Sequence, residues 1–344
     1  MKGRVIALDH LNGRKAAAML EDGVLVDLLV EAEQADPRPG AIFRAICDRP
    51  MKGQGAMMVR LPGGRSAFLR KGKGLVSGQP VLVQVSGRAE DAKAVPATTR
   101  ILLKSRYAIV TPGAPGINVS RQIRDEEERT RLLEIAHAVA EGAPGKEDGL
   151  ILRSAAEGAD EDVVADDIAA MRDLAAQIAG EAEGSEPELL LEGPDVHMLA
   201  WRDWPRPDLF TEAPGCFAEH GLNETISAIL APKQPLKGGG IAFIEPTRAF
   251  VAIDVNTGGD TSQAAGLKAN IALARDLPRL LRCRGLGGQI VIDFAPMAKK
   301  DRRQLEQILR AALRRDSVET ALAGWTPLGN FELQRKRERV PVRL

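Results

Sequence analysis

The sequence predicts a mixed α/β protein of several domains, in which an OB-type β-barrel near the N-terminus is followed by α/β subdomains. Three observations support this class. Short β-runs between Gly/Pro turns fill the first 107 residues, strands alternate with helices after them, and a strand–helix–strand unit spans residues 249–294. The length of 344 residues is enough for two or three domains.

The N-terminal third has the pattern of a small all-β unit. Residues 15–30, 56–69 and 80–87 are apolar runs of strand character, separated by turn residues. Their spacing suits an OB-type barrel of about five strands. The order of the runs also indicates that this barrel is inserted into an N-terminal strand pair that belongs to a larger core.

Strands and helices alternate in the middle of the chain. The pattern predicts a strand within residues 107–123, a charged helix at 125–141, a strand at 149–156 and a long helix at 160–183. Residues 205–216 are rich in proline and glycine, and they are predicted to form a loop.

Composition narrows the classes of protein. Lys plus Arg and Asp plus Glu both total 47, so net charge neither favours nor excludes a nucleic-acid partner. Cys47, Cys216 and Cys283 are far apart and odd in number, which argues against a disulfide framework and against a Cys-x-x-Cys zinc site. No signal peptide and no apolar span of about 18 residues is found, so we expect a cytoplasmic protein without a membrane span.

Two aspartates end two apolar runs. Residues 249–256 and 289–294 have strand character, and the helix-like residues 262–288 between them end at glycines, which predicts a parallel crossover. The dense apolar content predicts that both strands are covered on both faces. Asp254 and Asp293 occupy nearly equivalent late positions, so their carboxylates are expected to converge.

Converging carboxylates repel each other, and a shared proton or a divalent cation relieves that repulsion. Mg²⁺ prefers oxygen ligands and keeps several waters, so it fits a site with two or three protein oxygens. Asn256 is placed to add a carbonyl oxygen or to orient a phosphate. The alternative is that Asp254 and Asp293 cap the following turn or helix, a common role for a strand-terminal aspartate. Spacing alone leaves both interpretations open.

Six segments resemble, in order along the chain, the bacterial ribonuclease E/G family. They are "AFL" at 67–69, "INVSRQI" at 117–123, "GLILRSA" at 149–155, "FIEPTRAFVAIDVNTG" at 243–258, "LRCRGLGGQIVIDFAPM" at 281–297 and "NFELQRKRER" at 330–339. The resemblance implies an OB-type RNA-binding barrel, a sensor of the RNA 5′-monophosphate, an RNase H-like subdomain and a catalytic subdomain. The expected domains are 1–35 (N-terminal strands of the RNase H-like core), 36–107 (OB barrel), 108–220 (5′-sensor and RNase H-like region) and 221–344 (catalytic subdomain with the metal site).

The resemblance also implies roles for single residues. It makes Asp254 and Asp293 ligands of Mg²⁺, for which Mn²⁺ can substitute, and Asn256 their catalytic partner. It implies a 5′-phosphate pocket built from Arg153, Ser154 and Val119, although Arg153 by itself has the pattern of a strand-end salt bridge. It implies RNA contacts by Phe68, Arg335 and Arg337, the two arginines lying on one face of an extended segment beside the active site.

The sequence departs from the family in several places. The chain ends at Leu344 without the Cys-Pro-x-Cys zinc-link and small domain of the longer members, so it resembles a short form and no zinc is expected. Met58 stands where the barrel of the family commonly has a stacking phenylalanine, and Ser154 stands where threonine is usual.

The expected function is that of a Mg²⁺-dependent endoribonuclease that cleaves single-stranded RNA in RNA processing or mRNA decay. A homodimer is compatible with the sequence. One alternative is a non-catalytic single-stranded RNA-binding protein, but Asp254, Asn256 and Asp293 are all present, which favours an enzyme. A metal-dependent nuclease that acts on DNA is a further alternative, because contacts to the 2′-hydroxyl cannot be recognised in a sequence.

Overall fold

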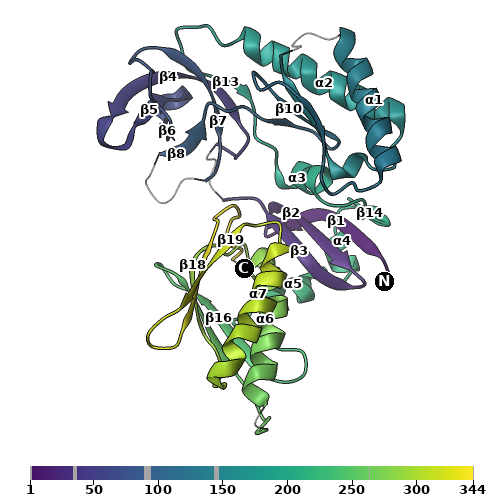
Figure 1. Ribbon diagram of the computed structural model, residues 1–344, viewed down its shortest axis with the longest axis vertical. Coiled ribbons are helices and arrows are strands. Elements are labelled where there is room, and N and C mark those ends of the chain that lie inside the picture. Colours follow the sequence, from purple (N-terminus) through teal and green to yellow (C-terminus); the bar gives the residue numbers. More distant parts are fainter. Residues whose placement is uncertain (1, 34–36, 89–93, 143–146, 263, 344) are drawn as a thin grey trace. The chain divides into compact units, whose positions relative to one another are not determined.

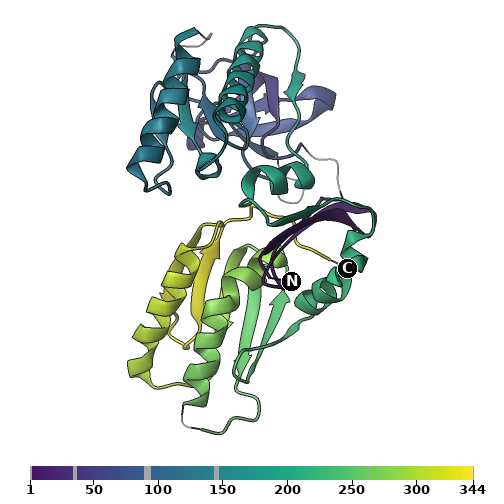
Figure 2. The same ribbon diagram turned by 90° about the vertical axis from the view of Figure 1, so that its right-hand side faces the viewer.

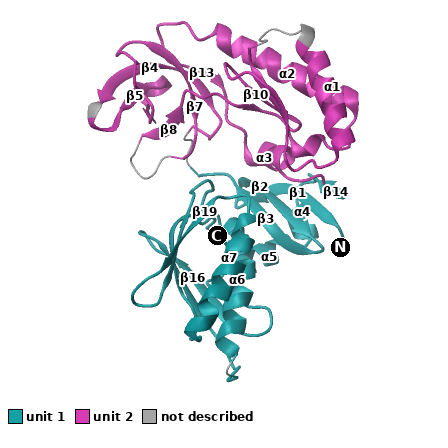
Figure 3. Ribbon diagram, viewed as in Figure 1, with its two compact units in different colours: residues 1–33, 207–344 teal, residues 34–206 magenta. Residues whose placement is uncertain are grey.

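The computed structural model describes residues 2–33, 37–88, 94–142, 147–262 and 264–343. It divides the chain into two compact units (Figure 1, Figure 3). Unit 1 is built from residues 1–33 and 207–344, and unit 2 from residues 34–206. The predicted fold class is confirmed, since both units mix helices with sheets and unit 2 contains a closed β-barrel.

The barrel of unit 2 has five strands in the order β4-β5-β6-β8-β7, and pairing of β7 with β4 closes it. β6 and β8 are parallel, and the other neighbours in the barrel are antiparallel. Its interior holds Phe43, Met57 and Val83. The prediction of an OB-type barrel is therefore confirmed. The strands are β4 (Ile42–Met51), β5 (Ala56–Arg60), β6 (Ser66–Leu69), β7 (Pro80–Val85) and β8 (Val95–Thr98), and β13 (Glu188–Leu191) pairs with β4.

The rest of unit 2 is a four-stranded sheet with helices, and it has its own hydrophobic core. The strand order is β11-β12-β10-β9. The two predicted helices are present as α1 and α2, and the side chain of Asp160 caps α2 by accepting from the backbone N–H groups of Asp162 and Val163. The elements are β9 (Leu103–Lys104), β10 (Ala108–Thr111), β11 (Ile117–Val119), β12 (Gly149–Leu152), α1 (Glu126–Gly142), α2 (Glu161–Gly180) and α3 (Val196–Asp203).

Unit 1 begins with an antiparallel meander of β1 (Arg4–Leu11), β2 (Arg14–Glu21) and β3 (Val24–Val30). A fourth strand, β14 (Leu209–Thr211), lies parallel to β1. The prediction of a loop over residues 205–216 is thus wrong for the part that forms β14, because three residues without alternation carry no recognisable strand signal. Two helices follow, α4 (Cys216–Glu219) and α5 (Leu222–Leu230).

The second sheet of unit 1 has six strands in the order β15-β16-β17-β18-β20-β19. β17 and β18 are parallel neighbours joined through α6, as the crossover pattern predicts. α6 and α7 cover one face of this sheet (Figure 2). Their apolar side chains join one core with those of both sheets. The elements are β15 (Lys233–Pro235), β16 (Ile241–Pro246), β17 (Val251–Asn256), β18 (Gly288–Asp293), β19 (Thr320–Trp325), β20 (Phe331–Arg335), α6 (Ala265–Cys283) and α7 (Arg302–Arg314).

The opposite face of the six-stranded sheet is open, which corrects the prediction that β17 and β18 are covered on both faces. Along β17 the buried residues Val251, Ile253 and Val255 alternate with Ala252, Asp254 and Asn256, which are partly or fully exposed. β18 shows the same alternation. The apolar residues Ala252 and Val291 on the open face made the sequence look like a strand buried on two sides.

Gly285 makes the turn that leads from α6 into β18. Its backbone is left-handed, with φ +65°, and a Cβ there would lie 1.9 Å from the carbonyl oxygen of Val340. Only glycine meets both conditions without strain. The C-terminal segment therefore packs directly against the end of α6.

All three cysteines are buried and free, as the sequence predicts. Burial raises the pKa of the Cys283 thiol to about 12, so this thiol stays protonated and unreactive. No helix in the described ranges has both the length and the apolar content needed to cross a membrane.

Candidate functional site

Asp254 and Asp293 lie side by side on the open face of the six-stranded sheet. Each stands near the carboxyl end of its strand, and the two are direct register partners across the parallel pair β17–β18. Neighbouring strands are about 4.8 Å apart, so both carboxylates start from adjacent points and project from the same face. The crossover thus brings together the two aspartates that the sequence predicts to converge.

Asn256 lies two residues beyond Asp254 on the same face of β17. Its side-chain amide donates a hydrogen bond of 2.6 Å from Nδ2 to Oδ2 of Asp254. This bond fixes one carboxylate oxygen and leaves the amide oxygen of Asn256 available as an acceptor or ligand. The bond is local, because residues two apart on a strand share a face.

The donor set fits a hard divalent cation. Asp254 and Asp293 are exposed, and among the residues that the structure describes no lysine or arginine forms an ion pair with either. Two adjacent unpaired carboxylates repel each other, and a cation between them removes that repulsion. The described residues contain no cluster of three or more His, Cys, Asp or Glu side chains suited to a metal. A site here would thus rest on two carboxylates and an amide oxygen, which suits an ion that keeps several waters.

Two further residues lie in the same cross-strand row as the aspartates. Phe243 on β16 is the register partner of Asp254, and Lys233 on β15 is the partner of Phe243. Sequence analysis does not single out either residue. The alternation of buried and exposed positions along β15 and β16 indicates the face on which Lys233 and Phe243 lie. Only the pairing of β15, β16 and β17 places these two residues beside the carboxylates.

Arg335 has a different environment from the one expected of an RNA-contacting residue. Its side chain is 1% exposed and forms an ion pair of 2.5 Å with Asp316, whose side chain is fully buried. It shares the buried face of β20 with Phe331 and Leu333, opposite to the face that carries Asp254. Burial lowers the pKa of Arg335, and the charge of Asp316 opposes this effect. Arg335 therefore belongs to the interior of unit 1, a position that disfavours RNA contact, and the contact stays a prediction.

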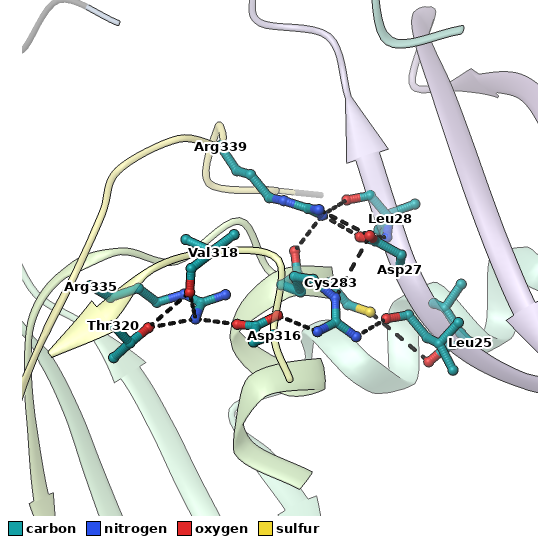
Figure 4. Close-up of polar contacts among 11 residues, drawn as sticks. Leu25, Asp27, Leu28, Cys283, Asp316, Val318, Thr320, Arg335 and Arg339 are labelled. Carbon is teal, nitrogen blue, oxygen red and sulfur yellow. Dashed lines mark hydrogen bonds and ion pairs between the residues drawn. The ribbon is translucent and has the colours of Figure 1, made fainter. Parts of the chain in front are cut away.

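Arg335 is the end of a chain of alternating charges (Figure 4). Asp316 pairs with both Arg335 and Arg282, and Asp27 on β3 pairs with both Arg282 and Arg339. Burial acts to lower the pKa of Arg339, but the charge and hydrogen bond of Asp27 together with the charges of Cys283 and Asp316 outweigh it, so the pKa is raised. The five charges tie β3, α6, β20 and the C-terminal segment together.

Arg337 follows the end of β20 and is exposed. Its guanidinium lies over Gly288, the first residue of β18, where φ is +92° and a Cβ would stand 2.6 Å from Nη2 of Arg337. Arg335 and Arg337 therefore do not share one face of an extended segment, because the strand ends at Arg335.

Arg153 directly follows the last residue of β12 in unit 2 and is held by an ion pair. Its Nη2 lies 2.7 Å from Oδ1 of Asp203, and its Nη1 donates to the carbonyl oxygens of Ser105 and Arg202. Burial acts to raise the pKa of Asp203, but the hydrogen bond and charge of Arg202 and the charge of Arg153 outweigh it, so the pKa is lowered. Asp203 is thus a carboxylate already bound to the guanidinium that is predicted to take a phosphate. The 50-residue separation gives no sequence signal for this pair.

The other two residues of the predicted 5′-phosphate pocket lie close to Arg153 in the fold. Val119 on β11 is the register partner of Leu152, the residue before Arg153, and it is buried. Ser154 is exposed and begins a short 3₁₀ turn. The sheet therefore brings Val119, Arg153 and Ser154 close together, and phosphate binding by them stays a prediction.

Phe68 lies on the outer surface of the barrel. It alternates with the buried residues Ala67 and Leu69 on β6, and its register partners are Met58 on β5 and Pro96 on β8. Its ring is half-buried between these neighbours. The position has the geometry of a small stacking surface, although RNA contact by Phe68 remains a prediction.

The model of the ribonuclease E/G family matches residues 102–211 and 205–338. Ribonuclease E from Nostoc sp. (strain PCC 7120) is 30% identical over 300 residues, which cover 76% of this chain and 43% of the relative. Ribonuclease G from Salmonella typhimurium (strain SL1344) is 28% identical over an alignment 389 residues long, gaps included. This alignment covers 94% of this chain and 78% of the relative.

Ribonuclease G from Haemophilus influenzae is 26% identical, with 94% of this chain and 77% of the relative covered. This chain thus spans less than half of the Nostoc ribonuclease E and about three quarters of the two ribonucleases G. Both segments that carry the candidate sites, residues 117–154 and 243–293, lie within the residues that the family model matches. The chain belongs to the ribonuclease E/G family.

Proposed function

We propose that this protein is an endoribonuclease that hydrolyses phosphodiester bonds of single-stranded RNA in RNA processing or decay, with Mg²⁺ held by Asp254 and Asp293. The observation that carries the proposal is the register pairing of these two aspartates at the carboxyl ends of adjacent parallel strands. Membership of the ribonuclease E/G family supports the same reaction class.

The residues of the open face have separate tasks in this proposal. Asp254 and Asp293 hold the cation, and Asn256 fixes the orientation of Asp254 through its 2.6 Å hydrogen bond. Bound Mg²⁺ supplies charge that stabilises the phosphate and activates water for attack. The open face lets a polymer lie across the strands, and the product is an RNA with a 5′-phosphate.

We further propose that Arg153, with Ser154 and Val119, binds the 5′-monophosphate of the RNA. The planar guanidinium suits bidentate recognition of a phosphate. Arg153 already forms an ion pair with Asp203, so a phosphate that binds Arg153 has to replace this carboxylate. The proposed sensor is therefore a site of anion exchange.

The decisive experiment compares matched RNA and DNA oligomers with a 5′-monophosphate, each with and without Mg²⁺. The proposal expects Mg²⁺-dependent cleavage of RNA within the chain. Binding of RNA without cleavage in Mg²⁺ or Mn²⁺ would favour a non-catalytic RNA-binding protein. Equal cleavage of DNA would show a nuclease that does not select ribose.

A further inference from the structure

A groove of about 560 Å³ runs between α6 and α7 in unit 1, away from the residues discussed so far. Residues at helical spacing form its two sides, with arginines at i, i+4 and i+7 on α6 and small or aliphatic residues on α7. The apolar part consists of Pro278, Ile308, Ala311 and Ala312, and the charged part consists of Arg275, Arg279, Arg282, Arg315 and Asp316.

The four arginines of the groove differ in whether a carboxylate of the protein already neutralises their charge. Arg279 forms a two-point ion pair with Asp276, with distances of 2.6 and 2.7 Å. Arg282 pairs with Asp316 and donates to the carbonyl oxygen of Val26. These two side chains therefore hold the structure together.

Arg275 and Arg315 are exposed and stand outside this network. Within the described part of the chain, no carboxylate or other acceptor bonds to either guanidinium. The groove thus presents two uncompensated cations beside aliphatic surface, which is an arrangement that attracts an anion with an apolar face.

The groove is separate from the candidate active site. α6 and α7 cover the buried face of the six-stranded sheet, whereas Asp254 and Asp293 project from the open face. On α7, Leu305, Leu309 and Leu313 point into the core, whereas Ile308 and Ala311 lie on the neighbouring side of the helix that lines the groove. Arg315 follows the last residue of α7. A phosphodiester at the two aspartates is therefore separated from the groove by the sheet.

We propose that this groove binds an acidic, amphipathic helical segment of a partner protein. Seven residues separate Arg275 from Arg282, so the groove is about 10 Å long and matches about two turns of a bound helix. Aliphatic residues of that helix contact Ile308 and Ala311, which are partly or fully exposed, and its flanking carboxylates pair with Arg275 and Arg315. This is the geometry of helix-in-groove recognition, with charges that set the orientation.

Single-stranded RNA is the competing occupant, and the lining disfavours it. Binding of single strands commonly uses aromatic side chains on which bases stack. None of the described residues that line the groove is aromatic. Its aliphatic surface contacts methyl and methylene groups well but offers no stacking platform.

The test uses a synthetic helical peptide of about 18 residues, long enough to span the groove with turns to spare, with a leucine and alanine stripe flanked by glutamates. A matched peptide has glutamine at every glutamate position. Fluorescence anisotropy is measured with the full chain. We expect the glutamate peptide to bind, with an affinity that falls as salt rises, and the glutamine peptide to bind at least about tenfold more weakly.

Two double variants separate the groove from general electrostatics. Arg275→Gln with Arg315→Gln should weaken binding of the glutamate peptide by about tenfold, because both uncompensated cations are lost. Arg310→Gln with Arg314→Gln removes the same charge from exposed positions of α7 that do not line the groove. This control should change the affinity less than about twofold.

Cleavage of RNA should be the same in both double variants and in the unmodified protein. Equal losses of peptide affinity in the two double variants would overturn the proposal, as would a failure of the glutamate peptide to bind. Displacement of the peptide by a single-stranded RNA that binds more tightly and depends on Arg275 and Arg315 would also overturn it, since the groove would then be an RNA site.

Discussion

Asp254 and Asp293 are direct register partners on adjacent parallel strands, with no cationic partner for either among the described side chains. Asp254→Asn or Asp293→Asn should lower RNA cleavage at least about 100-fold, because each change removes a charge from the cation site and keeps the side-chain volume. Cleavage of a 5′-monophosphorylated RNA measures the effect. Glu224→Gln, an exposed change on α5, is the matched control and should retain activity. Full activity in either aspartate variant would refute the shared cation.

Removal of the metal gives an independent prediction for the same pair. EDTA should abolish cleavage, and Mg²⁺ or Mn²⁺ should restore it, since both ions accept carboxylate oxygens. Asn256→Ala should lower activity by about 10- to 100-fold and raise the Mg²⁺ concentration needed for half-maximal rate, because Asp254 loses its orienting hydrogen bond. An unchanged Mg²⁺ requirement in Asn256→Ala would show that this bond does not orient the ligand.

Arg335 and Arg337 should behave differently although they are two residues apart. Arg335→Ala leaves Asp316 buried with one partner fewer, so the free energy of unfolding should fall by about 3–5 kcal/mol, as measured by urea denaturation. Arg337→Ala removes an exposed side chain and should cost less than about 1 kcal/mol. If Arg337 contacts RNA, its loss lowers the slope of log affinity against log salt by about 0.7. Equal stability of the two variants would contradict the interior role of Arg335.

Substitutions of Arg153 and Asp203 should have opposite effects on the preference for an RNA with a 5′-monophosphate. Arg153→Ala should remove any preference for a 5′-monophosphate over a 5′-hydroxyl, whereas Asp203→Asn should strengthen it by freeing the guanidinium. The ratio of cleavage rates on the two RNAs measures both effects. A preference that survives in Arg153→Ala would place the sensor elsewhere.

The same ion pair predicts a pH dependence. The pKa of Asp203 is lowered in the folded protein, so its contribution to stability is complete above the unfolded value of about 3.9 and is lost as pH falls through the lower folded value. The loss of stability on acidification should therefore be smaller in Asp203→Asn than in the unmodified protein. Thermal unfolding between about pH 2 and pH 6 tests this, and parallel curves would contradict it.

Phe68→Ala should weaken binding of single-stranded RNA by about 1–3 kcal/mol if one base stacks on the ring. Val76→Ala removes another exposed apolar side chain of unit 2 and serves as the control. Unchanged affinity in Phe68→Ala, measured by fluorescence anisotropy, would mean that the barrel binds RNA without this ring.

The sequence predicted those features that depend on neighbours along the chain. The crossover and the convergence of Asp254 with Asp293 follow from apolar runs, glycines and the direction of parallel strands. The barrel follows from short runs between turns. Each of these signals lies within a few tens of residues, where periodicity and turn chemistry act.

Features that depend on partners far along the chain escaped prediction. Arg335 lies in the basic run "QRKRER", which looks like a solvated surface, but its burial depends on Asp316 and Arg282. Phe331, Leu333 and Arg335 are two residues apart along the strand, which was a local sign that they share the buried face. The charge of the arginine obscured this sign. Asp203 is likewise recognised as the partner of Arg153 only in the folded chain.

The insertion of residues 34–206 between the two segments of unit 1 has a consequence for synthesis on the ribosome. Unit 2 is continuous in sequence, so its barrel and its helices can form while residues 207–344 are still being translated. β1, β2 and β3 leave the ribosome before β14 and α6, which they pair with or pack against, and must wait for both. The nascent chain therefore carries an apolar three-stranded ribbon, exposed to chaperones and to aggregation, until translation of the last third supplies its partners.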